Sequence, residues 1–364
     1  DLRALRDTRP RTGSQHTRFA GVAAVILLAA TALGTWQWQD GQDTRWLYAE
    51  ALPEIQRLND LDSVFDAFSI LENAARRLPD DPEVQRYISQ ITAPVAVTSD
   101  PPDARVLIRD YRRPEDPWLE VGRTPLESVP LPWSILACRG EKRWRVPFEG
   151  SRAPLVHREI SVELSPLSEA RAGMVRVEGG SQTRGGVRVR FEPHWIDRYE
   201  VSRADFKQFI DAGGYAASEW WPAGSARLRP TLVDATGRPG PADWEVGLYP
   251  LGTDSLPVTG VSWYEASAYC RWKGMDLPTF FHWIKSARLG NPTEILELSN
   301  YGSALAARGE FHGLGPWGAY DMAGNAKEWI YNEWTGGGKG IMGGAWDEPE
   351  YRFLNLDRAD PAER

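Results

Sequence analysis

Residues 315–346 read GPWGAYDMAGNAKEWIYNEWTGGGKGIMGGAW, and this stretch decides how the large C-terminal part of the chain folds. Glycines are interspersed with four tryptophans: Trp317, Trp329, Trp334 and Trp346. Because large aromatic rings bury much apolar area and glycine lets the backbone pass close to them, this density predicts a packed core. Asn325 and Glu328 place two hard oxygen ligands three residues apart, as a calcium site requires. The same spacing also fits an ordinary turn followed by a short helix or strand, with Glu328 solvated or paired to an arginine.

Length and composition are those of a globular protein with two or three domains. The 364 residues are 25% charged and 42% hydrophobic, and their net charge of -8 disfavours a nucleic-acid partner. The two cysteines, Cys138 and Cys270, fall in different predicted domains, so we expect two small buried apolar residues and no mutual disulfide. The chain opens at Asp1 and its first methionine is Met174, so we expect part of a longer protein.

Residues 19–36, FAGVAAVILLAATALGTW, form an uncharged run long enough to cross a bilayer as a helix. A signal peptide is the alternative, although its apolar region is usually shorter. Arginines are concentrated in residues 1–18, and tryptophans at the end of the run resemble an interfacial belt. We therefore predict a single-pass inner-membrane protein with a transmembrane helix at 19–36. Residues 1–18 are expected to be a cytoplasmic juxtamembrane segment, and the later domains extracytoplasmic, in the periplasm.

The next two segments differ in the period of their apolar residues. Apolar residues recur at helical spacing from residue 44 onward, which predicts a helical linker over residues 41–92. From residue 94 they alternate with polar residues, as in strands, which predicts a small β domain over residues 93–166. The motifs SDPPDARV at 99–106 and GRTPL at 122–126 resemble PEGA domains. That resemblance implies a small all-β sandwich.

Residues 173–364 are predicted to form one α+β domain. We expect Ser202 to cap a helix over 203–212, Ser262 to cap a second helix, and a third helix over 280–288. A buried strand is expected at 257–263. The segment contains the motifs IDRYEV at 196–201, PVTGVSWYEASAYCRW at 257–272, DMAGNAKEW at 321–329 and GGAW at 343–346. In this order they resemble the formylglycine-generating enzyme (sulfatase-modifying factor) family over about half of the chain, which implies its C-type-lectin-like α+β fold.

The resemblance also implies which metals the domain binds. Asn325, Ala326 and Glu328 match residues that hold a structural calcium in the family, and we expect one calcium site. In the family's oxidases, two cysteines that follow the GGAW-like motif bind copper(I) and attack the substrate cysteine. Glu348 and Phe353 occupy these positions here, and neither supplies the thiolate that copper(I) and disulfide exchange require. We therefore expect no copper and no oxidase activity.

These features predict a non-catalytic ligand-binding or sensor head. The domain order resembles the C-terminal part of bacterial Ser/Thr kinases fused to formylglycine-generating-enzyme-like domains, which implies a kinase domain upstream and a role in signalling. The alternative is an active oxidoreductase of the same family, non-copper or iron-dependent, acting on protein or small thiols. The predicted ligand contacts are Trp220, Trp221, Trp346, Glu348, Glu350, Arg352, Asn355 and Arg358. For each of them, core packing or a solvated charge is the alternative role.

Overall fold

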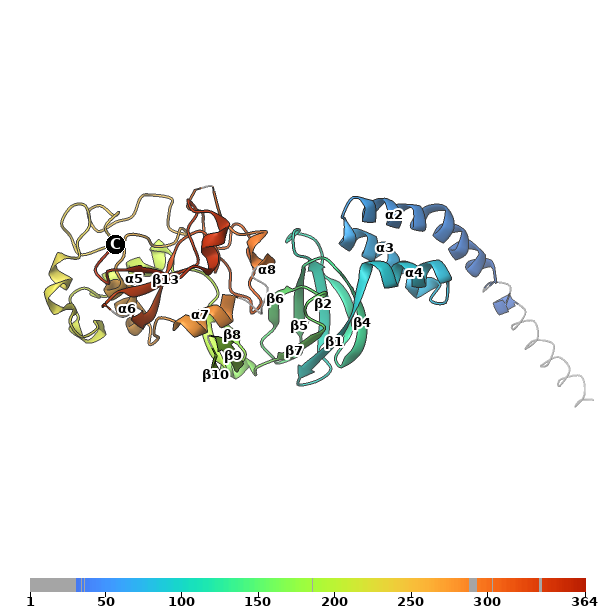
Figure 1. Ribbon diagram of the computed structural model, residues 1–364, viewed down its shortest axis with the longest axis horizontal. Coiled ribbons are helices and arrows are strands. Elements are labelled where there is room, and N and C mark those ends of the chain that lie inside the picture. Colours follow the sequence, from blue (N-terminus) through green and yellow to red (C-terminus); the bar gives the residue numbers. More distant parts are fainter. Residues whose placement is uncertain are drawn as a thin grey trace, which may run out of the picture. The chain divides into compact units, whose positions relative to one another are not determined.

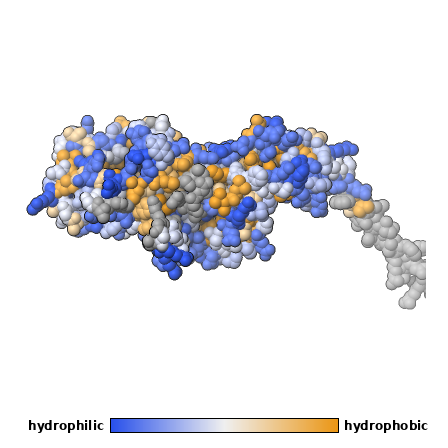
Figure 2. All heavy atoms as spheres, in the orientation of Figure 1, coloured by the Kyte–Doolittle hydropathy of each residue, from blue (hydrophilic) through white to orange (hydrophobic). Residues whose placement is uncertain are grey.

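The computed structural model describes residues 31–33, 35, 37–184, 186–287, 293–302, 304–333 and 336–364. The chain divides into two compact units, one ending at Thr92 and the other spanning Ala93–Arg364 (Figure 1). Hydrophilic side chains predominate on the face shown in Figure 2, in keeping with a chain that is 25% charged. Two features discussed above, the segment 1–18 and Trp334, lie outside the described residues.

The first unit is helical. Residues 37–46 are helical, and a π turn and three α-helices follow: η1 (Leu47–Ala51), α2 (Leu52–Asp60), α3 (Val64–Arg77) and α4 (Pro82–Ile91). Helix α4 has a defined start because the Asp81 carboxylate accepts hydrogen bonds from the backbone N–H groups of Glu83 and Val84. The helices bury one apolar face each, in a small core that includes Leu47, Ile55, Leu71, Val84 and Ile91.

The structure corrects the prediction of a transmembrane helix. Among the described residues, no helix has both the length and the apolar character that crossing a bilayer requires. The helical residues 37–46, QWQDGQDTRW, carry charged side chains, which are costly inside a membrane. Most of the predicted span, residues 19–30 with 34 and 36, lies outside the described residues. The predicted single-pass inner-membrane location with extracytoplasmic domains is therefore not supported.

The second unit begins with strands in two sheets. They are β1 (Thr92–Asp100), β2 (Arg105–Asp110), β3 (Leu119–Arg123), β4 (Leu126–Pro132), β5 (Leu136–Glu141), β6 (Phe148–Arg152) and β7 (Glu159–Glu163). One sheet has the order β4-β1-β7, with β1 and β7 parallel, and the other has the antiparallel order β3-β2-β5-β6. The buried side chains of β1 and β7 follow the period of two expected from the sequence, as at Val95, Val97 and Ile160. Strands β2 and β5 instead bury three consecutive residues each, including Ile108 and Leu136.

These sheets pack against the rest of the second unit. The Tyr111 hydroxyl donates a hydrogen bond to the Leu314 carbonyl over 3.0 Å, and the Arg152 guanidinium donates to the Pro316 carbonyl over 2.6 Å. Because of such contacts, the strands and the segment from residue 173 onward belong to one compact unit. A PEGA-like sandwich is not shown, and the predicted fold class is corrected on this point as well.

The remainder of the second unit combines short helices and small sheets with long loops, so the predicted α+β class fits. Its helices are α5 (Arg203–Asp211), α6 (Trp263–Trp272), α7 (Phe280–Ala287) and α8 (Thr293–Leu296). Its strands are β8 (Met174–Val177), β9 (Gly180–Arg184), β10 (Val187–Phe191), β11 (His194–Asp197), β12 (Glu328–Glu333), β13 (Lys339–Met342) and β14 (Asp357–Ala359). They pair as β11-β8, β10-β9 and β12-β13-β14. Single 3-10 turns lie at η2 (Leu167–Glu169), η3 (Ser218–Trp220), η4 (Ser225–Arg227), η5 (Arg229–Thr231) and η6 (Glu350–Leu354).

Helices α5 and α6 begin at the residues that the sequence predicted. Ser202 and Asp205 form a reciprocal capping box at the start of α5, and Ser262 and Glu265 form another at the start of α6. Each box satisfies backbone N–H groups that a helix start otherwise leaves without partners. The prediction of a strand at 257–263 is wrong. Within this segment Pro257 makes an isolated β-bridge to Ser202, and Ser262 is already the N-cap of helix α6.

Two apolar clusters form the core of this part. One surrounds Trp283, which is fully buried, and includes Met322, Ile330 and Phe353. The other contains buried aromatic side chains of α5, α6 and the following loops: Phe206, Phe209, Tyr215, Trp221 and Tyr269. The density of aromatic residues thus makes a packed core, as the sequence predicts.

Candidate functional site

The segment after β13 contains the two positions at which copper chemistry would need thiolates. Glu348 Oε1 lies 2.6 Å from Lys327 Nζ and 3.5 Å from Arg352 Nη2. Phe353 is 1% exposed, and its ring centroid lies 5.9 Å from that of Trp283. The first position is therefore ion-paired and the second belongs to the core, so neither presents a nucleophile.

Glu348 belongs to a network of two acids and two bases. Asp357 completes it, with one oxygen 2.9 Å from Lys327 and 3.4 Å from Arg352. Burial alone disfavours the charge on Lys327, but its hydrogen bonds to Glu348 and Asp357 outweigh burial and raise its pKa. Among the described residues, the second oxygen of Glu348, Oε2, is buried without a hydrogen-bond partner.

Beside this network lie three carboxyl groups: that of Asp321, which is 4% exposed, and those of Glu200 and Glu328, which are half-buried. The described residues provide no ion-pair partner for them, and Trp283 donates a hydrogen bond to Glu328. Burial raises the pKa of Glu328 to about 7, with a further contribution from the charge of Asp321. Burial also raises the pKa of Asp321 to about 6 and that of Glu200 well above its ordinary value. Such a group of acids favours either protonation or a nearby cation.

Asn325 binds one of these acids, Glu200, and has the left-handed conformation (φ 56°) that asparagine tolerates. Its side-chain nitrogen donates to Glu200 over 2.7 Å, while its oxygen accepts from Asn300 Nδ2 and from the Ala306 N–H, both over 3.0 Å. No group of three or more His, Cys, Asp or Glu side chains arranged for a metal ion is present in the described part of the chain. Whether Asn325, Ala326 and Glu328 hold calcium stays a prediction, and the Asn325 side-chain oxygen already accepts two hydrogen bonds.

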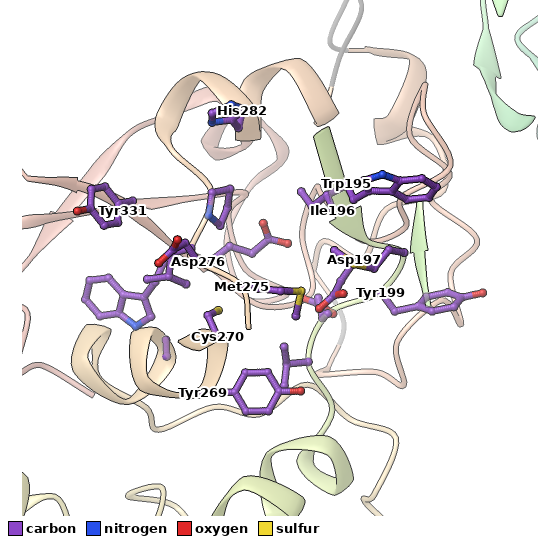
Figure 3. A pocket seen from close by; sticks show the side chains of 18 of the residues that line it. Trp195, Ile196, Asp197, Tyr199, Tyr269, Cys270, Met275, Asp276, His282 and Tyr331 are labelled. Carbon is purple, nitrogen blue, oxygen red and sulfur yellow. The ribbon is translucent and has the colours of Figure 1, made fainter. Parts of the chain in front are cut away.

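A cavity of about 750 Å³ lies next to these acids, between β11, α6, the segment 274–279 and β12 (Figure 3). Aromatic side chains make up much of its lining: Trp195, Tyr199, Tyr269, Trp329 and Tyr331. Four carboxylic acids also line it: Asp197, Glu200, Asp276 and Glu328. The volume is that of a small-molecule site.

The histidines and the cysteine of this cavity have shifted pKa values. The rings of His194 and His282 meet edge to face with centroids 4.6 Å apart. Burial, and then repulsion from His282, lowers the pKa of His194 to about 4, and burial lowers the pKa of His282. Burial raises the pKa of the Cys270 thiol to about 12, which keeps it protonated and unreactive.

The predicted ligand contacts lie at separate places. Trp221 is buried and its Nε1 donates to the Gly214 carbonyl, while Trp220 packs against the same core cluster. Glu348 and Arg352 come together in the ion-pair network. The remaining residues are half-buried or exposed around the C-terminal segment: Trp346, Glu350, Asn355 and Arg358. None of the predicted contacts lines the cavity, so their role in binding stays a prediction.

Of the predicted site residues, Ala326 and Glu328 line the cavity, whereas sequence reasoning missed the other residues of its lining. Trp195, Asp197 and Tyr199 lie in and after β11, and Asp276 lies in the segment after α6. The local signal was present, because WIDRYEV at 195–201 mixes aromatic and acidic residues. Reading it as a site required knowledge of which distant segments face it.

These features define an α+β domain with an aromatic-lined cavity and without cysteine in the segment after β13. The family described as "Sulfatase-modifying factor enzyme 1-like domain" matches residues 162–360, and the chain belongs to this family.

Its relatives include active and inactive proteins. The formylglycine-generating enzyme of Thermomonospora curvata is 31% identical over 46% of this chain and 73% of its own. The mouse protein named inactive C-alpha-formylglycine-generating enzyme 2 is 26% identical over 43% of this chain and 65% of its own. Serine/threonine-protein kinase pkn1 of Chlamydia pneumoniae is 29% identical over 51% of this chain and 32% of its own. The chain spans about half the length of the mammalian formylglycine-generating enzymes that it matches.

Proposed function

We propose that the family domain of this chain is a non-catalytic ligand-binding domain. The observation that carries the proposal is the pair of positions Glu348 and Phe353, of which one is ion-paired and the other buried in the core. Copper(I) needs soft thiolate ligands, and a mixed disulfide needs sulfur, so neither side chain substitutes for cysteine. The mouse relative that is named inactive supports the proposal, because it indicates that this family includes proteins without the enzymatic activity.

The proposal extends to a structural calcium and to a kinase. Calcium would be held by Asn325, Ala326 and Glu328, and would supply the positive charge that the buried acids lack.

The likeness to the Chlamydia kinase pkn1 supports a place for the domain in a Ser/Thr kinase-containing signalling protein, as its ligand-binding part. The complete open reading frame tests the second point, because a kinase domain in the same frame is expected.

An oxidation assay tests the absence of catalysis. The full chain is incubated with copper(I), dioxygen and a cysteine-containing peptide, and aldehyde formation is followed by mass spectrometry. The Thermomonospora curvata relative serves as the positive control. We expect the relative to convert the peptide and this chain to leave it unchanged. Copper-dependent conversion by this chain would refute the proposal, and conversion with iron(II) in place of copper would establish the alternative oxidoreductase.

A further inference from the structure

The walls of the 750 Å³ cavity are suited to a positively charged ligand. Trp195, Tyr199, Tyr269, Trp329 and Tyr331 contribute aromatic side chains from segments that are distant in the sequence. Aromatic faces attract cations through the ring quadrupole, most strongly where water is excluded. A cavity of this size and lining therefore accommodates an apolar body and favours a positive group on it.

Two aspartates add negative charge to this lining. Asp197 and Asp276 lie on opposite sides of Met275 in the view of Figure 3. Asp197 is half-buried and Asp276 is at the exposed mouth. The described residues offer neither carboxylate a hydrogen bond or an ion pair within bonding distance. Both carboxylates are thus available to a ligand in the cavity.

The cations around the cavity have other partners. Lys327 is bound to Glu348 and Asp357, and Arg308 is paired with Asp205. Arg171 lies against the Trp195 ring, with its guanidinium carbon 6.0 Å from the ring centroid, and Lys273 lies 5.3 Å from that of Trp272. The two histidines of the lining have lowered pKa values and are neutral at pH 7. Burial raises the pKa of Asp197, and the charges of Lys273 and Arg308 oppose this only in part. Neither aspartate has a direct counter-ion among the described residues.

We propose that this cavity binds a small organic cation, namely a protonated amine on an apolar body, with the amine between Asp197 and Asp276 and the body against the aromatic walls. The inference rests on the proposed ligand-binding function and names the ligand class of the domain. A neutral molecule of the same shape gains the aromatic contacts without the ionic attraction. An anion of the same shape is repelled by both carboxylates.

The experiment compares three probes of similar shape and different charge: phenethylamine, 2-phenylethanol and phenylacetate. Binding to the full chain is measured by saturation-transfer NMR and by calorimetric titration at pH 7. We expect phenethylamine to bind at least tenfold more tightly than the alcohol, and phenylacetate not to bind. Added salt should weaken the binding of the amine, because the attraction is partly electrostatic.

Two variants locate the site. Asp197→Asn and Asp276→Asn each remove one charge at nearly constant shape, and each should weaken amine binding about tenfold. Asp276 is exposed, so its variant is expected to fold even if the half-buried Asp197 variant does not. Asp254→Asn is the matched control, since Asp254 is exposed and does not line the cavity. It should leave the affinity unchanged.

Several results would overturn the inference: no binding of phenethylamine, equal binding of the alcohol, or an unchanged affinity in the Asp276→Asn variant. These results concern only the ligand class and leave the non-catalytic function standing. Conversion of the cysteine peptide in the oxidation assay, by contrast, would refute the proposed function irrespective of amine binding.

Discussion

At the scale of single residues, a buried carboxylate is held by one partner three residues away and by two partners from distant segments. Glu265 is 0% exposed, and its Oε1 accepts from Arg364 Nη2 over 2.9 Å and from the Tyr215 hydroxyl over 2.5 Å. Its Oε2 accepts from the Ser262 hydroxyl over 2.7 Å. The helix cap of α6 is thus joined to the C-terminal segment through one charged group.

Arg364→Met should therefore be strongly destabilising. It keeps an apolar stem but leaves Glu265 as a buried charge without its counter-ion, which costs about 3–5 kcal/mol. The free energy of unfolding, from urea denaturation followed by tryptophan fluorescence, measures the loss. Arg358→Met is the control, because Arg358 is exposed in the same segment. Addition of Glu265→Gln to Arg364→Met should recover part of the stability; equal stability of the two arginine variants would contradict this role.

At the scale of elements, the loop that leads into β12 concentrates negative charge. Glu200, Asp321 and Glu328 come together there, and the Glu200 carboxylate accepts hydrogen bonds from the Asn325 side chain and the Ala326 N–H. The three raised pKa values have burial as their first cause. A bound calcium ion would relieve the mutual repulsion of these groups.

Calcium should therefore raise the melting temperature of the chain relative to a chelator. With ligand at 100 times its dissociation constant, the stabilisation amounts to about 2.7 kcal/mol, which is several degrees. Glu328→Gln should abolish the shift, whereas Glu333→Gln, at the exposed end of the same strand, should retain it. The melting temperature is measured by differential scanning calorimetry. Identical curves with calcium and with chelator would rule out the site.

At the scale of the whole second unit, the two sheets meet the loop after α8 with almost no space between backbones. A Cβ atom added to Gly150 of β6 would lie 2.1 Å from the Pro316 carbonyl oxygen. On the same surface, the rings of Phe148 and Trp317 pack edge to face with centroids 6.4 Å apart. Only glycine permits this approach, so residue 150 controls how closely the sheets pack.

Gly150→Ala should force the two parts of the unit apart. Overpacking of this kind costs about 1–3 kcal/mol, so the melting temperature should fall by several degrees. Gly140→Ala, in the neighbouring strand β5, is the matched control because its added Cβ meets the nearest side-chain atoms at 3.8 Å, an ordinary contact. Calorimetry of both variants measures the difference. A similar melting temperature for the two variants would show that the contact tolerates a methyl group.

Short-range sequence signals predicted much of the secondary structure. The Ser202 and Ser262 caps, the start of α7 at Phe280 and the change from helical to strand period near residue 93 could all be predicted, because they depend on neighbours within about four residues. The family could be predicted for the same reason, since its motifs are short and ordered along the chain. Trp221, a candidate ligand contact in the sequence analysis, is 7% exposed and packs among other aromatic rings, so its role in binding stays a prediction.

The sequence by itself determined that residues 162–360 belong to the sulfatase-modifying factor family and that Glu348 and Phe353 occupy positions where the resemblance predicts copper-binding cysteines. Only the tertiary structure decided what replaced them, namely the ion pair of Glu348 with Lys327 and the burial of Phe353 against Trp283. It also decided that Asp197 and Asp276 share one cavity. The physical reason is the sequence separation of the interacting residues. Helix caps and apolar periodicity arise from neighbouring residues, whereas ion pairs, burial and cavities arise when packing brings distant segments together.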